Sequence, residues 1–238
     1  MGISPPPLID MALFRQRNFT LAGVVNFLVG SVLIIAMVNV PLIVNVLTPA
    51  LDTAALRSGL LLSALTAAMA IFAYLGGRLT AQRGYRLVAA AGLLLCAAAF
   101  AVMGLTWTVD SQNVAMALAL AVLGAGFGLV TTPVGTAVIN AAPDDQRGIA
   151  ASLVIVFRLI GMSVGLSALT SWGLNRFETL RTQIQLPDLP ITDPTYQQAL
   201  VDGLSNLTVT VLAETFLVSA GIAVLALLVS LLLRPDSE

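Results

Sequence analysis

Six long apolar stretches, separated by short polar segments, constrain this chain more than any other feature of its sequence. The hydrocarbon core of a bilayer is about 30 Å thick, and a helix needs roughly 20 apolar residues to cross it. Only 10% of the 238 residues are charged, against about 25% in soluble domains. The sequence therefore predicts an all-α integral membrane protein, a bundle of six transmembrane helices at about 19–47, 58–77, 86–106, 113–140, 148–173 and 207–233.

The polar segments divide the chain into three parts. Residues 1–18 precede the first apolar stretch and are expected to form a cytoplasmic or interfacial linker, whereas residues 235–238 form a cytoplasmic tail. Between them, residues 19–234 hold the six-helix bundle. The longest polar connection within the bundle, at about 174–206, is rich in proline and is expected to be an external loop.

All eleven basic residues are arginine, and their distribution predicts the orientation of the chain. With six spans, both termini lie on the same side as the second and fourth connections. That side carries seven arginines and the opposite side carries three. Because cytoplasmic connections are enriched in basic residues, both termini are expected in the cytoplasm. The net charge of −1 gives no indication of nucleic-acid binding.

The connection after the second apolar stretch reads GGRLTAQRGYR and is the most basic segment of the chain. Its glycines allow two helix ends to turn tightly, and its arginines suit the anionic cytoplasmic face of a membrane. The spacing resembles the loop signature of the major facilitator superfamily, which falls here on Gly77, Arg78, Leu79, Arg83, Gly84 and Arg86. Ala81 and Gln82 stand where the family usually has an acidic and a basic residue, a departure that favours the carboxy-terminal half of such a protein.

Two further segments carry the same resemblance. Residues 124–165 look like late helices of the fourteen-helix drug:proton antiporter branch, and residues 6–23 are similar to the linker before its last six helices. The resemblance implies one half of a secondary transporter whose halves rock around a central site, lined here by the first, second, fourth and fifth spans. It implies proton-coupled efflux of small amphipathic compounds or drugs across the bacterial inner membrane by alternating access. The partners would be the substrate, protons, the bilayer and either a missing amino-terminal half or a second copy.

Arg158 lies near the middle of the fifth span, about 15 Å along the helix from Gly148. A charge at this depth is costly when it faces lipid, so the side chain should face protein or water. Arg158 is therefore a candidate for the transport pathway, together with Asn26 in the first span and Thr132 in the fourth. The alternatives are structural, because Arg158 could bond carbonyl groups of the fourth span and Asn26 could bond a neighbouring helix.

Small residues and prolines recur along one face of several spans. Glycines spaced three or four residues apart let helix backbones approach closely, and a proline can bend a helix. We therefore expect either close packing or a gate for alternating access at Gly124, Gly128, Pro133 and Gly135 in the fourth span, Gly161 and Gly165 in the fifth, and Pro41 in the first.

Glu214 is the only carboxylate well inside a span, and a buried carboxylate can carry a proton. Because the chain has no histidine, Glu214 is the candidate for proton coupling. The alternative is a polar helix contact or a position at the outer rim, because the resemblance places the last helix of each half away from the cavity. No cofactor and no metal site are expected, since the sequence holds no phosphate-binding loop and no cluster of metal ligands.

Three functional interpretations remain open on the sequence. The chain could be part of a longer transporter, a small protein that dimerises into a pathway, or a non-transporting membrane protein that stabilises or regulates a partner. An enzyme is not expected. Residues 161–165 fit the G-x-S-x-G nucleophile pattern of hydrolases, but Ser163 lies in the middle of a span in a chain without histidine.

Overall fold

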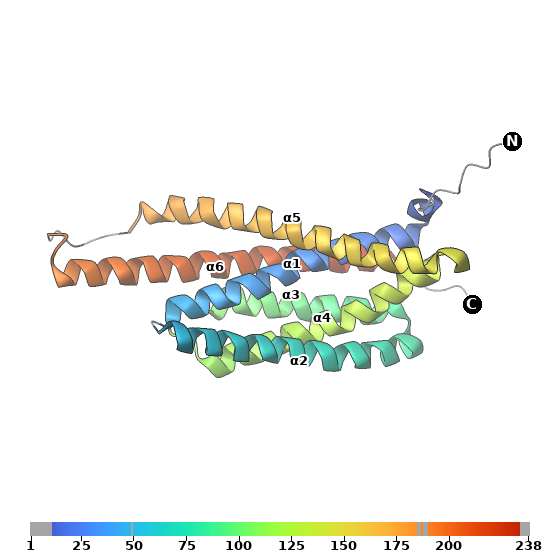
Figure 1. Ribbon diagram of the computed structural model, residues 1–238, viewed down its shortest axis with the longest axis horizontal. Helices are drawn as coiled ribbons and strands as arrows, with labels where there is room; N and C mark the ends of the chain where they lie inside the picture. The colour runs from blue at the N-terminus through green and yellow to red at the C-terminus, as the bar shows by residue number, and fades with distance from the viewer. Residues whose placement is uncertain (1–10, 49, 185–186, 188–189, 234–238) are drawn as a thin grey trace.

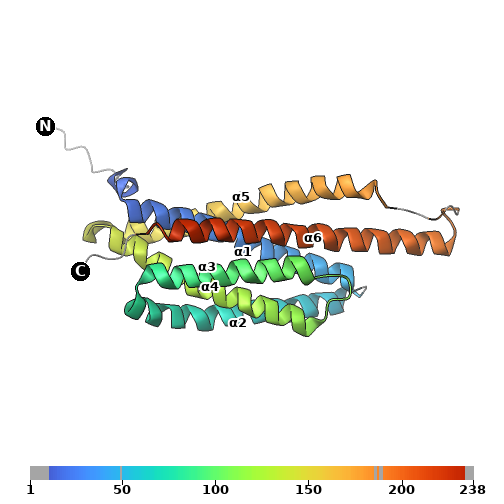
Figure 2. The same ribbon diagram turned by 180° about the vertical axis from the view of Figure 1, so that it is seen from behind.

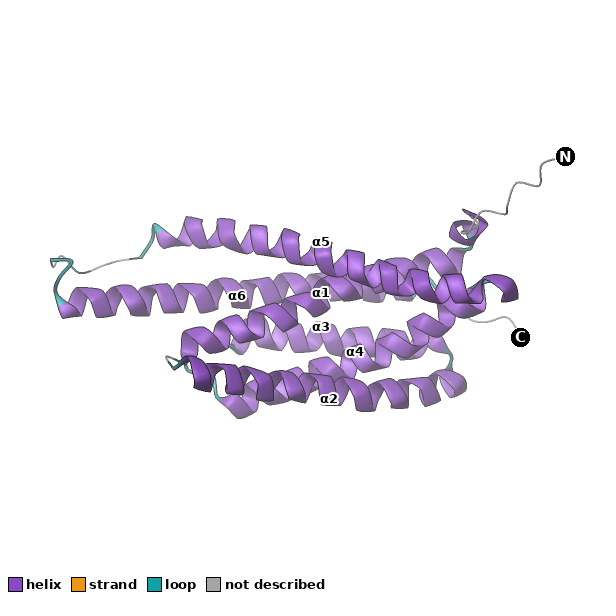
Figure 3. Ribbon diagram, in the orientation of Figure 1, coloured by secondary structure: helices purple, strands orange, loops and turns teal. Residues whose placement is uncertain are grey.

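The computed structural model describes residues 11–48, 50–184, 187 and 190–233, and the regular structure within these ranges is entirely helical (Figure 3). The α-helices are α1 (Arg17–Leu47), α2 (Leu51–Arg83), α3 (Tyr85–Thr106), α4 (Asn113–Ala141), α5 (Arg147–Arg181) and α6 (Pro194–Ser230), and short 3-10 helices at Met11–Arg15 and Asp144–Gln146 precede α1 and α5. All six α-helices are long and apolar enough to cross a membrane. The prediction of an all-α bundle with six membrane-spanning helices is confirmed. Residues 1–10 of the expected linker and the expected tail at 235–238 lie outside the described residues.

The helix ends differ from the expected spans mainly at the connection between α5 and α6. Helix α5 continues to Arg181 and α6 begins at Pro194, so most of the expected loop at 174–206 is helical. The start of α6 has a local cause, because the Asp193 side chain accepts a hydrogen bond from the Thr195 backbone N–H at 2.8 Å and proline suits the first helical turn. As a result, both helices extend past the rest of the bundle (Figure 1).

Helix α1 runs through the middle of the bundle. It contacts α2, α4, α5 and α6, whereas α3 packs mainly on α4 and α6. In Figure 1, α5 and α2 border the side nearest the viewer, and the view from behind brings α6 and α3 to the front (Figure 2). The two ends of the described chain lie at the same end of the bundle as the turn between α2 and α3, as an even number of spans requires (Figure 1).

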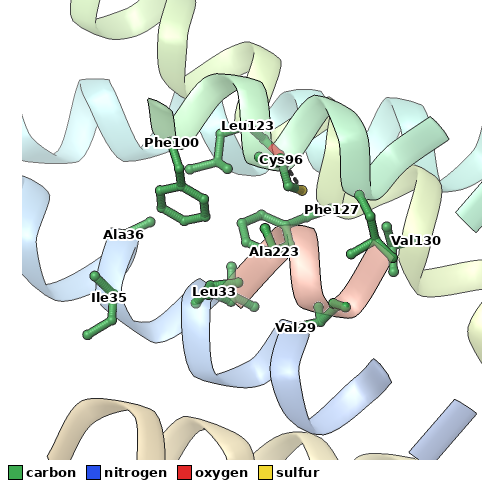
Figure 4. Packing of buried hydrophobic residues seen from close by; sticks show 14 of the residues in the cluster. Val29, Leu33, Ile35, Ala36, Cys96, Phe100, Leu123, Phe127, Val130 and Ala223 are labelled. Carbon is green, nitrogen blue, oxygen red and sulfur yellow. Dashed lines mark hydrogen bonds between the residues drawn. The ribbon is translucent and has the colours of Figure 1, made fainter. Parts of the chain in front are cut away.

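The core between α1, α3, α4 and α6 contains a cluster of aromatic rings. The ring of Phe100 lies 6.2 Å from that of Phe127 and 6.1 Å from that of Phe216. The Trp107 ring lies edge-on at 5.4 Å from Phe216. Figure 4 shows Phe100 and Phe127 beside Cys96, which is fully buried. Aromatic pairs at these separations stabilise a core beyond the area they bury, so the cluster joins α3, α4 and α6 firmly.

Helices α2 and α5 are the two most exposed helices of the bundle. In the most apolar stretch of each helix, 61% of the residues are buried in α1 and in α4, but only 17% in α2 and in α5. A helix that is apolar all round has to be covered by lipid or by other protein. The chain therefore leaves two of its apolar helices largely uncovered.

Candidate functional site

Arg158 of α5 and Asn26 of α1 face each other across the contact between these helices. The Arg158 Nε and Nη2 atoms donate hydrogen bonds to Asn26 Oδ1 at 3.1 and 2.9 Å, and Asn26 Nδ2 donates to the Val154 carbonyl at 3.0 Å. Asn26 is buried and Arg158 is half-buried. Within the described ranges, no carboxylate forms an ion pair with Arg158. A positive charge therefore lies in the middle of an exposed helix, and its partner among the described residues is an amide.

The guanidinium group of Arg158 keeps hydrogen-bonding capacity. Arginine carries five N–H donors in a fixed fork, and the contacts with Asn26 use two of them. A charge within a membrane should face protein or water, so the remaining donors suit an acceptor from outside this chain. Both polar atoms of the Asn26 amide are bonded to α5, Oδ1 to Arg158 and Nδ2 to the Val154 carbonyl, and Asn26 therefore orients the guanidinium group.

Gly161 and Gly165 bring the backbone of α5 against that of α1. A Cβ atom on Gly161 would collide with the Phe27 carbonyl oxygen, and one on Gly165 would lie 2.5 Å from Ser31 Cα. The Ser31 hydroxyl also donates a hydrogen bond to the Gly161 carbonyl at 2.9 Å. Because Gly161 follows Arg158 by one helical turn, this contact sets the position of the guanidinium group along α1.

Gly124, Gly128 and Thr132 lie at the contact between α4 and α2. A Cβ atom on Gly124 would collide with the Leu65 carbonyl oxygen, and one on Gly128 would also meet the α2 backbone. The Thr132 hydroxyl donates a hydrogen bond to the Ala73 carbonyl at 3.0 Å. The structure therefore places Thr132 in helix packing and does not bring it together with Arg158 and Asn26.

The two prolines expected to bend helices lie inside continuous helices, Pro133 in α4 and Pro41 in α1. Gly135 is not part of the α2 contact, because a Cβ atom there would meet no heavy atom within 4 Å. Asn39, two residues before Pro41, is 6% exposed, and in the described part of the chain its Nδ2 atom has no hydrogen-bond partner. Asn39 is not among the residues predicted for the site, although an amide within an apolar span is a signal that could identify it.

Glu214 of α6 forms an ion pair with Arg176 of α5. The two carboxylate oxygens accept hydrogen bonds from Arg176 Nε at 2.7 Å and Nη2 at 3.0 Å. Bidentate pairs of this kind are the strong form of arginine–carboxylate contact. Arg176 falls in the stretch predicted to be an external loop, so this pair was not predicted. It arises because α5 continues as a helix past residue 174.

The signature loop turns at a single glycine, Gly84, which has a φ of +78° and separates α2 from α3. Residues with a Cβ atom rarely adopt this conformation. The Arg78 guanidinium lies over the ring of Tyr74, 5.9 Å from its centre, whereas Arg83 and Arg86 line a hollow of about 760 Å³. Two signature residues are half-buried in the last turns of α2, Gly77 and Leu79.

Two kinds of chemical site remain, a metal site and a nucleophilic serine. In the part of the chain that the structure describes, no group of three or more His, Cys, Asp or Glu side chains could hold a metal ion. Ser163 lies within the continuous helix α5 and not at the strand-to-helix turn that a nucleophilic serine of this pattern requires. The candidate site is the contact between Arg158 of α5 and Asn26 of α1.

Comparisons with known proteins identify the family of this chain. A family model described as "Major Facilitator Superfamily" matches residues 4–178. The triacylglyceride transporter of Mycolicibacterium hassiacum is 33% identical over 249 residues, which cover 97% of this chain and 46% of that protein. The triacylglyceride transporter of Mycobacterium tuberculosis is 35% identical over 184 residues, which cover 73% of this chain and 35% of that protein.

A solved structure shares the fold. The crystal structure of the Escherichia coli fucose:proton symporter matches 92% of this chain and 49% of that chain with a TM-score of 0.66 and 18% identity. The chain thus spans less than half the length of these relatives. The expected six-helix half of a major-facilitator fold is confirmed, and the relatives are transporters and not enzymes. This chain belongs to the major facilitator superfamily.

Proposed function

We propose that the chain is the carboxy-terminal half of a secondary transporter that exports lipid-like or other amphipathic compounds by proton-coupled alternating access. The lipid class comes from the relatives in Mycolicibacterium hassiacum and Mycobacterium tuberculosis, which are named triacylglyceride transporters. The transporter would lie in the bacterial cytoplasmic membrane. Both termini and the signature loop would face the cytoplasm, as the distribution of arginines favours.

The observation that carries this proposal is the uneven burial of the helices. Helices α2 and α5 are apolar yet mostly uncovered, whereas α1 and α4 are the most buried. Lipid could cover the apolar side chains of α5, but it would not satisfy the Arg158 guanidinium. A second six-helix unit packed on α2 and α5 would cover both helices and enclose Arg158 and Asn26 in a cavity between the two units.

An amino-terminal half, or a second copy of the chain, would supply that second unit. The chain covers only 46% of the Mycolicibacterium hassiacum relative, which favours the amino-terminal half. When the two halves differ in sequence, the second half can place a carboxylate opposite Arg158 across the cavity. A polar group of the substrate could also reach Arg158 there. This acceptor would complete the hydrogen bonds that Asn26 leaves open.

Reconstitution into lipid vesicles tests the proposal. The chain is co-expressed with the amino-terminal half of the Mycolicibacterium hassiacum relative, and the purified complex is compared with the chain alone. The complex should move a fluorescent triacylglyceride analogue to the inner leaflet faster when the vesicle lumen is acidic, and the chain alone should not. Transport by the chain alone would favour a dimer, and halves that do not co-purify would contradict the choice of partner. A complex that forms without transporting would contradict the transporter proposal and favour a stabilising or regulatory protein.

We assign the proton coupling of this transporter to Glu214. Protonation would remove the charge that binds Arg176 and would weaken the bidentate contact between α5 and α6. Proton binding to Glu214 would in this way be linked to the separation of α5 from α6. The Glu214→Gln variant is expected to transport at a rate that no longer responds to a pH gradient, while substrate exchange without a gradient continues.

The Glu214 prediction is checked by measuring initial rates in vesicles with and without an acidic lumen. Asp202→Asn is the matched control, because Asp202 is an exposed carboxylate on the same helix. This control should keep the response to the gradient. An unchanged response in Glu214→Gln would show that the pair with Arg176 only holds α5 and α6 together.

A further inference from the structure

A groove of about 240 Å³ lies between α1, α5 and α6, apart from the Arg158–Asn26 contact. Each of the three helices contributes residues spaced three or four apart, so one face of each helix forms a wall. Most of these side chains are aliphatic. Asn39 belongs to the α1 wall and lies eight residues before the end of that helix, about 12 Å along its axis. The groove is therefore in the half of the bundle toward which α5 and α6 extend.

Asn39 is a buried polar group of this wall whose hydrogen bonds are incomplete. Its side chain is 6% exposed, and the Nδ2 atom has no hydrogen-bond partner among the residues that the structure describes. The nearby threonine hydroxyls donate within their own helix, Thr208 to the Leu204 carbonyl at 2.8 Å and Thr215 to the Val211 carbonyl at 2.9 Å. A buried amide donor without an acceptor is unfavourable in apolar surroundings. Asn39 lines the groove, but its Nδ2 atom is covered in the structure, so an acceptor in the groove would reach this donor after a rotation of the Asn39 side chain.

We propose that this groove binds an acyl chain of a glycerolipid, with the ester carbonyl accepting a hydrogen bond from Asn39 Nδ2. An ester carbonyl is a neutral acceptor attached to a hydrocarbon chain, which matches one amide donor in a mostly apolar wall. The groove is smaller than the roughly 300–1,000 Å³ of pockets that enclose a whole drug-sized ligand, so it suits one chain and not a complete lipid. The proposal names a lipid contact for the proposed transporter and rests on that function for the lipid class.

Other occupants fit the groove less well. A buried water molecule is held by two to four polar partners, and Asn39, Thr170, Thr208 and Thr215 are the polar residues of the wall. A water molecule bound to them would give no preference for an ester lipid over an ether lipid. A charged headgroup would need a countercharge. The ion pair between Arg176 and Glu214, whose members are next in sequence to the wall residues Phe177 and Thr215, already satisfies both of its charges.

The test measures lipid binding without transport, on the full chain in detergent micelles. The probes are triolein and its ether analogue, tri-O-oleyl glycerol, which lacks the carbonyl groups, and bound lipid is counted by native mass spectrometry. The unmodified chain should prefer the ester by about tenfold, the effect of one hydrogen bond in an apolar site. Asn39→Leu should bring this ratio close to one by weakening ester binding alone. Asn45→Leu, at an exposed asparagine of the same helix, is the matched control and should keep the preference.

Two further variants locate the lipid in the groove. A Cβ atom on Gly173 would have only ordinary contacts, 3.7 Å from Val211 Cγ1 and 3.8 Å from Thr215 Oγ1, so Gly173→Leu should fill the groove and weaken binding of both lipids. Thr170 is an exposed residue of the wall, and maleimide labelling of Thr170→Cys should slow when triolein is bound. Cys96 is buried and should not be labelled.

Equal binding of the ester and the ether by the unmodified chain would overturn the proposal, as would an ester preference that survives in Asn39→Leu. Triolein binding that leaves the labelling of Thr170→Cys unchanged would place the lipid elsewhere. The labelling decides the question if Asn39→Leu does not fold, as judged by helicity and monodispersity. A reconstituted complex that keeps the ester preference but does not transport would contradict the proposed function and leave the groove assignment in place.

Discussion

Replacement of Arg158 by glutamine will lower the transport rate of the reconstituted complex by roughly 10- to 150-fold, with a normal amount of protein in the membrane. A hydrogen bond to a charged group contributes about 1.5–3 kcal/mol, and the factor corresponds to losing one such bond during transport. Glutamine keeps one donor toward Asn26, and the backbone contact at Gly161 does not depend on the guanidinium group. The measurement is the initial transport rate in vesicles, divided by the quantity of reconstituted protein.

Arg181→Gln is the matched control for the Arg158 variant. Arg181 lies on the same helix, its side chain is 61% exposed, and its ion pair with Glu178 is long, at 3.8 Å. Exposed pairs of this kind contribute little, so transport should not change. If Arg158→Gln is instead lost from the membrane, the role of Arg158 is structural. If it transports at the normal rate, Arg158 is not in the pathway.

The Gly124→Ala variant is expected to destabilise the bundle by about 3 kcal/mol, at the upper end of the usual cost of overpacking. The added Cβ atom would collide with the Leu65 carbonyl oxygen of α2. Since the colliding atom belongs to a backbone, no change of rotamer can relieve the contact, and α2 and α4 have to move apart. The free energy of unfolding, measured by titrating a denaturing detergent into mild detergent micelles, checks this result.

Gly135→Ala makes the same chemical change in the same helix and serves as the control. A Cβ atom on Gly135 would meet no heavy atom within 4 Å. The free energy of unfolding should therefore stay within about 0.5 kcal/mol of the original value. Equal losses in the two variants would contradict the close backbone contact between α2 and α4 at Gly124.

The number and order of the helices could be predicted because the length of an apolar run is set by the bilayer and not by neighbouring helices. The bilayer does not set the length of the polar ends of α5 and α6. The stretch at 174–206 is polar and rich in proline, yet α5 continues to Arg181 and α6 begins at Pro194. Asp193, which caps α6, is the local signal that predicts this start when helix caps are weighed together with hydropathy.

The site residues could be predicted individually, but their contacts could not. Arg158 and Glu214 were selected because charges are rare inside membrane spans. Their partners, Asn26 and Arg176, lie 132 and 38 residues away in the sequence, and no helical period relates positions that far apart. Asn39, like Asn26, is an amide within an apolar span, but the sequence alone does not show that its Nδ2 atom lacks a partner among the described residues.

The glycine contacts have a consequence for how the bundle can move. Where backbone touches backbone, no side chains are present to slide into new rotamers, so the two helices keep their alignment or come apart. Gly161 and Gly165 make such a contact between α5 and α1, and Gly124 and Gly128 make one between α4 and α2. Each helix contacts its own partner more extensively than it contacts either helix of the other pair. Shape changes should therefore shift α1 and α5 together relative to α2 and α4.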